Sequence, residues 1–136
     1  MRARGEVTYD GHTYVFDPSD SFAVLDWGRG VWTYKNTWYW SSLQTRLDDG
    51  RTFGFNLGYG FGDTTAASEN MLFVDGIAHK LDRVTFDIPT KNGKDDFMST
   101  WLITDNEGRL DMTFTPILDR ADKTDALIIS SDQHQV

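Results

Sequence analysis

The sequence predicts an all-β protein, an antiparallel meandering barrel or half-barrel. Short strand-like runs recur along the chain, and tight turns such as Asp10-Gly11 and Asp75-Gly76 join many of them. No segment shows the periodicity of an amphipathic helix. The segment 51–62 alternates bulky residues with glycines, a pattern typical of a strand that bends or meets another backbone closely. These observations favour a hairpin-connected sheet over an α/β arrangement.

The segment 51–62 has two different faces if it forms a strand, because alternate side chains point to opposite sides. Interior glycines destabilise a strand, so the face that lacks side chains needs an explanation. We expect another backbone or a sharp bend to lie against it, and a bound ligand is the alternative. The bulky residues are Phe53, Phe55, Leu57, Tyr59 and Phe61, and Gly54, Asn56, Gly58 and Gly60 lie between them.

The first part of the chain opens with a predicted hairpin over 6–9 and 12–16, whose Asp-Gly turn suits positive φ angles. Turn-forming residues at 17–20 end this hairpin. A third strand is expected over 22–25. It leads into the segment 26–32, which holds too much glycine for a helix and is predicted to be a bulged strand end or a loop at the mouth of the sheet.

The middle of the chain predicts two antiparallel neighbours, because Asp48-Asp49-Gly50 joins a strand over 36–47 to the glycine-rich strand. Trp38 and Trp40 would share one face of the first of these strands. The small polar residues at 63–68 indicate a loop. The rest of the chain predicts strands over 69–74, 77–81 and 84–89, an exposed mobile loop over 90–96, a hairpin over 100–104 and 109–115, an irregular segment over 117–124 and a last short strand over 126–130.

The final residues, 131–136, resemble a strand cut off in its middle. We therefore expect residues 1–136 to form a single β domain that is a fragment of a longer protein. Its sheet would then be incomplete at the C-terminal edge. Since an unpaired strand edge recruits other strands, a homodimer through that edge is expected.

The composition excludes several classes of function. The chain has 136 residues, no cysteine, and 13 basic against 21 acidic residues, which gives a formal charge of -8. The negative charge argues against nucleic acid as a partner. No apolar run is long enough to span a membrane, and no secretion signal precedes the first strand, so we expect a cytoplasmic protein. Aromatic residues make up 14% of the chain, which suits a large aromatic interior or groove.

The segment 26–32 places a carboxylate, a guanidinium and two indoles close together, at Asp26, Arg29, Trp27 and Trp32. An aspartate among aromatic rings can act as a proton donor when burial raises its pKa. Arg29 would oppose that effect by favouring the ionised carboxylate. The alternative is that Asp26 and Arg29 form a structural ion pair at a strand bend.

A second group of polar residues follows the glycine-rich strand. Asn56 lies on its bare face, where its amide could both donate to and accept from a ligand, and Glu69 and Asn70 follow the next loop. Glu69 could instead pair with Arg29 or Arg51. His134 lies in the polar tail, and the three histidines are never at metal-ligand spacing, so we expect no metal site and no cofactor.

Several blocks of the sequence resemble a known family. They are LDWGRGVWTYKNTWYW, FGFNLGYGFGDTTAASENMLFVDG, HKLDRVTF, PILDR and SDQHQV, in this order. Together they resemble the C-terminal part of family twenty-eight-oh-four among the domains of unknown function. More distantly, Asp26-Trp27-Gly28 resembles a motif of the lipocalin-like barrels that include carotenoid hydratases and tocopherol cyclases. That resemblance implies a lipocalin-like fold built from two halves that handle isoprenoid chains.

Three functions follow from these observations. The first is a lipocalin-like module that binds an apolar or amphipathic small molecule. The second is part of an acid–base enzyme, a hydratase, isomerase or cyclase, in which Asp26 donates a proton and tryptophans stabilise a carbocation. The third is a carbohydrate-binding sheet. The residues expected to bind the ligand are Trp27, Arg29, Trp32, Trp38, Trp40, Asn56, Tyr59, Glu69, Asn70 and His134.

Overall fold

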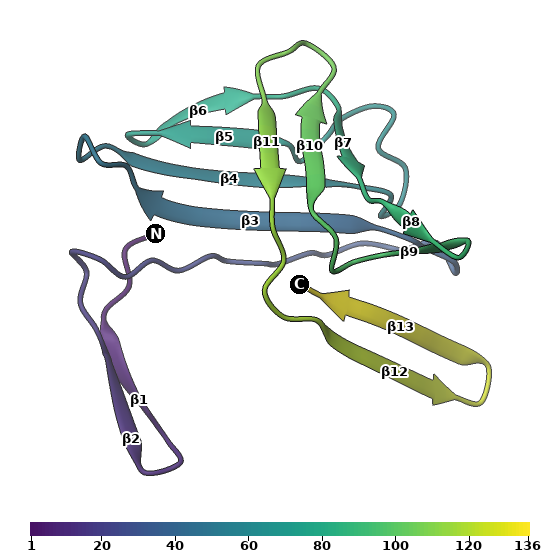
Figure 1. Ribbon diagram of the computed structural model, residues 1–136, viewed down its shortest axis with the longest axis horizontal. Coiled ribbons are helices and arrows are strands. Elements are labelled where there is room, and N and C mark those ends of the chain that lie inside the picture. The colour runs from purple at the N-terminus through teal and green to yellow at the C-terminus, as the bar shows by residue number, and fades with distance from the viewer. The chain divides into compact units, whose positions relative to one another are not determined.

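The computed structural model describes all residues from 1 to 136 and confirms the all-β class (Figure 1). Its strands form antiparallel sheets, and none of these sheets closes into a barrel, so the structure is compatible with a half-barrel. The chain divides into two compact units, Met1–Arg83 and Val84–Val136. No helix of the structure could cross a membrane. The prediction that residues 1–136 act as a single lipocalin-like domain stays a prediction.

The first unit contains a four-stranded sheet in the order β3-β4-β5-β6. Its strands are β3 (Tyr39–Arg46), β4 (Thr52–Tyr59), β5 (Met71–Val74) and β6 (Ile77–Lys80). β3 and β4 are antiparallel neighbours over their whole length, as the turn at Asp48-Asp49-Gly50 predicts. The loop over 63–68 is also confirmed, and Asp63 closes it by accepting from the backbone N–H and the hydroxyl of Thr65.

The two faces of β4 differ as the alternation predicts. Phe55 and Leu57 are buried on one face, where Phe53 also contacts Phe55 and Tyr59 contacts Tyr39. The strand ends at Tyr59, so the prediction that the alternation continues to Phe61 is wrong. The physical reason is Gly60, whose φ of 93° turns the chain out of the extended conformation.

The N-terminal hairpin is confirmed as β1 (Gly5–Tyr9) paired with β2 (His12–Phe16). Its two turn residues, Asp10 and Gly11, both have positive φ angles, which is the geometry that makes Asp-Gly a good two-residue turn. Asp17 accepts from the backbone N–H and the hydroxyl of Ser19, so the turn that follows β2 is also confirmed.

The predicted strand over 22–25 is wrong. Phe22 forms only an isolated bridge with Arg2, and the residues from 23 to 38 have no regular structure. Met1 and Ala3 supply the backbone partners of this bridge, and no further N–H groups extend it into a ladder. The segment 26–32 is therefore an irregular loop, and β3 begins at Tyr39, later than predicted.

The second unit contains a three-stranded sheet in the order β11-β10-β7. Its strands are β7 (Val84–Asp87), β10 (Trp101–Asp105) and β11 (Asp111–Phe114), as the alternation of these segments predicts. The buried apolar side chains of this unit are Val84, Phe86, Trp101, Ile103 and Leu110.

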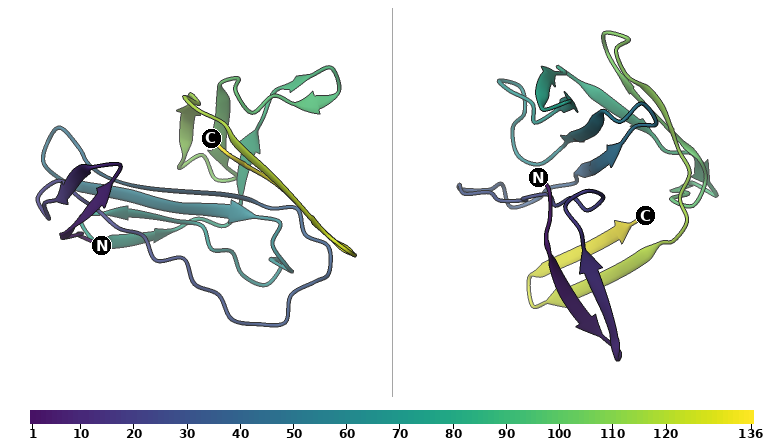
Figure 2. Two further views of the ribbon diagram at one scale, coloured as in Figure 1. Left: turned by 90° about the horizontal axis from the view of Figure 1, so that it is seen from below. Right: turned by 90° about the vertical axis from the view of Figure 1, so that its left-hand side faces the viewer.

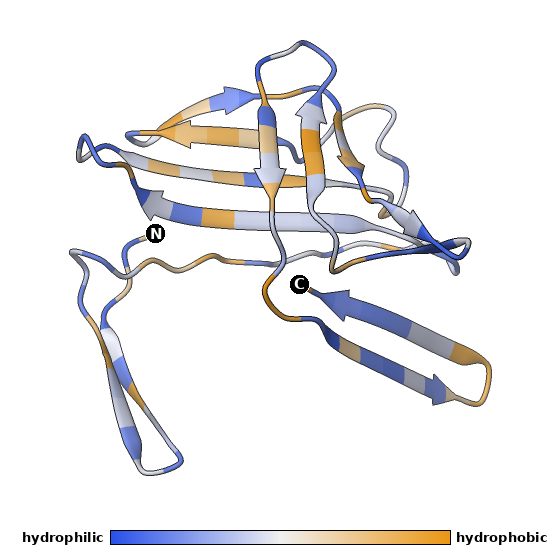
Figure 3. Ribbon diagram, in the orientation of Figure 1, coloured by the Kyte–Doolittle hydropathy of each residue, from blue (hydrophilic) through white to orange (hydrophobic).

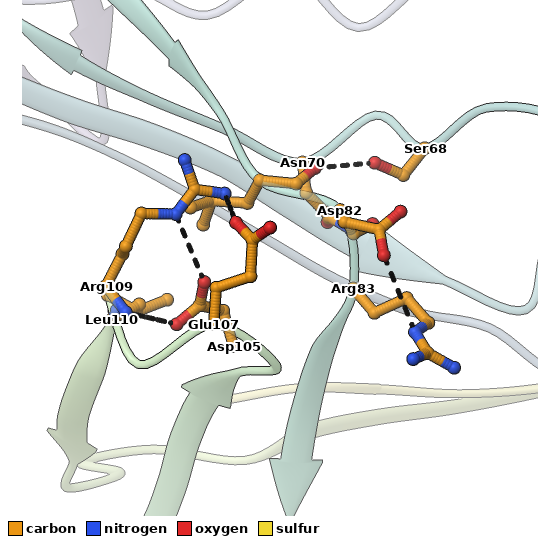
Figure 4. Close-up of polar contacts among 9 residues, drawn as sticks. Ser68, Asn70, Asp82, Arg83, Asp105, Glu107, Arg109 and Leu110 are labelled. Atoms are coloured by element: carbon orange, nitrogen blue, oxygen red, sulfur yellow. Dashed lines mark hydrogen bonds and ion pairs between the residues drawn. The ribbon is translucent and has the colours of Figure 1, made fainter.

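Asp105 closes the turn between β10 and β11 (Figure 4). Its buried carboxylate accepts from the backbone N–H groups of Arg109 and Leu110 at 2.7 and 2.8 Å. Burial alone would raise the pKa of Asp105, but the backbone donors and the nearby Arg109 guanidinium outweigh it and hold that pKa below its usual value. The stability that this carboxylate contributes is therefore present near neutral pH and is lost as the pH falls through the lowered pKa.

The loop predicted over 90–96 is exposed but forms a small hairpin, β8 (Thr90–Lys91) and β9 (Lys94–Asp95). The reason is the Asn92-Gly93 turn, whose φ angles of 55° and 75° match the two-residue hairpin geometry. Asn-Gly is a strong hairpin signal, so the sequence itself indicates this small hairpin.

The C-terminal segment also differs from the prediction. The residues expected to be irregular over 117–124, and those of the interrupted strand over 131–136, pair with each other as β12 (Arg120–Ala126) and β13 (Ile129–Gln135). The two strands lie side by side in every view (Figure 2), and their tip is apolar (Figure 3). The turn contains Leu127 at a φ of 51°, a conformation that leucine rarely adopts, so no ordinary turn signal marks it.

Candidate functional site

The bare face of β4 is the best-defined candidate site of the first unit. At Gly54 an added Cβ would lie 2.8 Å from the carbonyl oxygen of Leu43, and at Gly60 it would overlap the carbonyl oxygen of Thr37. Another backbone therefore lies against these two glycines, as expected. At Gly58 the added atom would lie 2.7 Å from the carboxylate of Glu69, so here a side chain occupies the space. Gly58 thus lets Glu69 reach the sheet.

A chain of hydrogen bonds crosses this face. The indole Nε1–H of Trp40 donates to Asn56 Oδ1 at 2.9 Å, and Asn56 Nδ2 donates to Glu69 Oε2 at 2.8 Å. The same Asn56 nitrogen lies 3.2 Å from the backbone carbonyl of Glu69. The amide orientation of Asn56 is therefore fixed, with its oxygen toward the indole and its nitrogen toward the carboxylate. These three side chains come from β3, from β4 and from the segment before β5.

Apolar side chains adjoin this polar chain on the same face. In the strand register Gly58 is opposite Trp40, Asn56 is opposite Met71, and Gly54 is opposite Phe73. Residues directly opposite each other point to the same side of a sheet. Trp40 is 41% exposed and Phe73 is 39% exposed. The face we call the glycine face, consisting of Trp40, Asn56, Glu69, Met71 and Phe73, therefore combines exposed rings with one hydrogen-bonded carboxylate.

Two other predicted tryptophans gather around Phe61. The ring centroids of Trp32 and Phe61 are 4.9 Å apart, and those of Trp38 and Phe61 are 5.3 Å apart. The indole of Trp32 also lies over Gly28 and Gly30, where an added Cβ would meet it at 3.3 and 3.4 Å. The glycines of the segment 26–32 thus make room for the Trp32 ring.

The structure does not bring Asp26, Trp27 and Arg29 to the glycine face. All three are exposed in the irregular loop, and Trp27 is 75% exposed. Nothing buries the carboxylate of Asp26 among aromatic rings. Glu69 accepts a hydrogen bond from Asn56, whereas Arg51 forms an ion pair with Asp49 at 2.7 Å. The alternative in which Glu69 pairs with Arg51 is therefore wrong.

Two further predicted residues have structural partners. The side chain of Asn70 is 1% exposed, accepts from the backbone N–H of Gly58 at 2.7 Å and donates to the carbonyl of Asp82 at 3.4 Å. It satisfies buried backbone groups at the end of β4. Tyr59 lies on the opposite face of β4, where its ring contacts Tyr39. Sequence reasoning missed Phe73 and Met71, which the register of β4 with β5 places on the face of Asn56.

His134 lies in the second unit, where Nδ1 is 3.0 and 3.2 Å from the carboxylate oxygens of Asp119. Its ring stacks on Phe97, with centroids 4.3 Å apart. No group of three His, Asp or Glu side chains is placed to hold a metal ion. Asp119 and Phe97 belong to no recognisable sequence motif. The pairing of β12 with β13, which positions His134, does not follow from the sequence pattern either.

Together these features define an all-β protein with open antiparallel sheets, one of which has a polar and aromatic face. The whole chain, residues 1–136, matches the family described as Domain of unknown function (DUF2804), and the protein belongs to that family. The resemblance of the sequence blocks to this family is thereby confirmed. Comparisons with curated proteins and with solved structures give no match.

Proposed function

We propose that the glycine face binds an amphipathic small molecule that has an apolar body and a hydroxyl or ammonium head. The observation that carries this proposal is the hydrogen-bonded chain from Trp40 through Asn56 to Glu69, which fixes a half-exposed ring beside a carboxylate. Small-molecule sites are lined mainly by apolar and aromatic groups with a few placed polar atoms, and this face has that composition.

The apolar part of the ligand would lie on Trp40 of β3 and on Met71 and Phe73 of β5. Trp40 cannot turn freely, because its N–H is bonded to Asn56 at 2.9 Å. A ring that is already oriented loses little entropy when a ligand binds, which favours affinity. Removing exposed apolar surface from water supplies the main driving force, about 25 cal/mol for each Å² buried.

The polar head would face Glu69. An ionised carboxylate is an acceptor with about four lone-pair positions, and Asn56 is the only side chain shown to donate to it here. A hydroxyl or an ammonium group can donate to the remaining positions. The carboxylate, and the formal charge of -8 on the whole chain, disfavour an anionic head such as that of a fatty acid.

Titration calorimetry with geraniol tests this proposal, with decanoate as an anionic probe of similar length. We expect saturable binding of geraniol that is at least about tenfold tighter than binding of decanoate, because burying two like charges together is costly. Trp40→Leu should weaken geraniol binding by about tenfold or more, since it removes both the ring and its fixed orientation. Trp27→Leu is the matched control, because Trp27 is exposed outside this face, and it should bind as the unchanged protein does. Equal binding by the Trp40 and Trp27 variants would refute the proposal.

A carbohydrate is the second candidate ligand, because a half-exposed indole beside an oriented amide and carboxylate also suits the flat apolar side and the hydroxyls of a sugar. The same Trp40 and Glu69 would be used. A glycan array distinguishes the two ligands. Binding to glycans that Trp40→Leu abolishes, together with no heat from geraniol, would favour the carbohydrate.

A further inference from the structure

A second cluster, in the unit Val84–Val136, has the organisation of an acid–base site. A cavity of about 580 Å³ lies beside the C-terminal hairpin. Two segments line this cavity. One is the β8–β9 hairpin together with Phe97, which follows it, and the other is strand β13. Its lining residues are Gly93, Lys94, Asp95, Phe97, Asp132 and His134.

His134 is held in one orientation by two independent contacts. Both carboxylate oxygens of Asp119 lie within hydrogen-bond distance of Nδ1, at 3.0 and 3.2 Å. The ring of Phe97 is stacked on the imidazole, with centroids 4.3 Å apart and planes inclined by 29°. The first contact fixes which nitrogen faces Asp119, and the second fixes the plane of the ring.

The contact with Asp119 also determines where the proton lies in the neutral imidazole. An ionised carboxylate can only accept a hydrogen bond, so Nδ1 must donate and Nε2 keeps its lone pair. Nε2 is 3.9 Å from the nearest oxygen of Asp132, too far for a hydrogen bond. His134 therefore has an unoccupied acceptor at a residue that lines the cavity, as a general base needs.

We propose that His134 is a general base for a neutral or cationic, hydroxyl-bearing substrate, and that Asp119 is its positioning residue. Nε2 takes the proton of the substrate hydroxyl, the electron pair of the broken O–H bond stays on oxygen, and the new imidazolium is stabilised by Asp119 and Asp132. The alkoxide oxygen then attacks an electrophilic centre of the same substrate, and the group that leaves that centre takes the proton from the imidazolium, so no other reactant is consumed. Asp95 and Asp132 outnumber Lys94 among the charged lining residues, which disfavours anionic substrates.

The residues of this site all belong to the second unit, and none of them belongs to the glycine face. It therefore does not depend on the proposed binding of geraniol. Sequence reasoning singled out His134 but had no basis for its partners. Asp119 precedes β12, and Ala121 is the residue opposite His134, so it is the β12–β13 pairing that brings Asp119 diagonally beside the histidine on the same face.

Long-range 15N NMR of the histidine side chains tests the proposal on the full chain. We expect His134 in the neutral state to carry its proton on Nδ1, whereas the exposed His12 and His79 serve as internal references without an Asp119 contact. Asp119→Asn should shift His134 toward the Nε2–H form, because an amide can donate to Nδ1. A dominant Nε2–H form in the unchanged protein would overturn the proposal.

Reaction with diethyl pyrocarbonate, a neutral electrophile, measures the reactivity of Nε2. Modification of His134, followed by mass spectrometry, should fall by about tenfold or more in Asp119→Asn, since positioning groups of this kind change imidazole function by such factors or more. His79 should react at an unchanged rate in the same sample. Circular dichroism of the variant checks its fold, and Asp132→Asn, which leaves the Asp119 contact intact, should keep the Nδ1–H form. Equal His134 rates in the unchanged protein and in Asp119→Asn would contradict the assignment.

Discussion

The two faces of β4 share one backbone but differ in burial and in side-chain composition. On one face Phe55 and Leu57 are buried and make the core of the sheet. On the other face Gly54 and Gly58 leave room for a neighbouring carbonyl and for the carboxylate of Glu69. A strict alternation can thus encode the core on one side and the proposed binding surface on the other, because successive side chains never share a face. Changes on the two faces should therefore have different effects.

Leu57→Ala should have the largest effect on stability. Leu57 is fully buried, so the variant loses the transfer energy of the side chain and leaves a cavity, together about 2–5 kcal/mol. Urea unfolding followed by circular dichroism measures this loss. A loss below about 1 kcal/mol would show that this face is not the core of the sheet.

Gly58→Ala should come next and should affect both properties. The new methyl group would lie 2.7 Å from a Glu69 oxygen and 3.0 Å from the carbonyl oxygen of Tyr39. The flexible Glu69 side chain can move away but the backbone carbonyl can move little, so we expect a destabilisation of about 1–3 kcal/mol. Displacing Glu69 should also weaken geraniol binding. Unchanged stability together with unchanged binding would mean that Glu69 does not lie against Gly58.

Asn56→Leu should destabilise the protein less but should weaken ligand binding. It removes the bonds from Trp40 and to Glu69, which at this partly exposed site contribute together about 1 kcal/mol. The Trp40 indole N–H signal in a 15N–1H spectrum should move, because its acceptor is lost. Thr45→Leu, on the opposite face of the same sheet, is the matched control and should leave that signal in place.

Glu69→Gln should have the smallest effect on stability, under about 0.5 kcal/mol, because Glu69 is exposed. Its effect should appear in selectivity instead. Since the repulsion of an anionic head disappears, the preference for geraniol over decanoate should shrink. A preference as large as in the unchanged protein would show that the carboxylate does not face the ligand.

Much of this comparison could be predicted from the sequence. The turns at Asp10-Gly11, 48–50 and Asp75-Gly76 fix the register of their hairpins, and that register places Trp40 and Asn56 on one face. Local chemistry decides these features, because the turn residues require positive φ angles. The contact of Glu69 with Asn56 depends on the path of the loop over 63–68, which no local signal describes.

Other parts could not be predicted, for identifiable reasons. β12 consists of exposed, mostly polar residues without an apolar alternation, and its turn contains Leu127 where a glycine or asparagine is usual. Asp26 and Trp27 looked like site residues because they are close in sequence to Trp32. The loop that carries them has no ladder to position them, and within the segment 26–32 it is Trp32 that contacts the ring of Phe61.

The most direct test of the central claim is a 15N–1H NMR titration of the full chain with geraniol. We predict that the Trp40 indole N–H and the Asn56 side-chain amide shift first and saturate together. The backbone amides of Gly54 and Gly58 should follow them. Signals from the opposite face of the sheet, such as that of Thr45, should move least. Largest shifts at the Trp27 indole or at Thr45, with the Trp40 indole unchanged, would contradict the assignment of the glycine face as the binding surface.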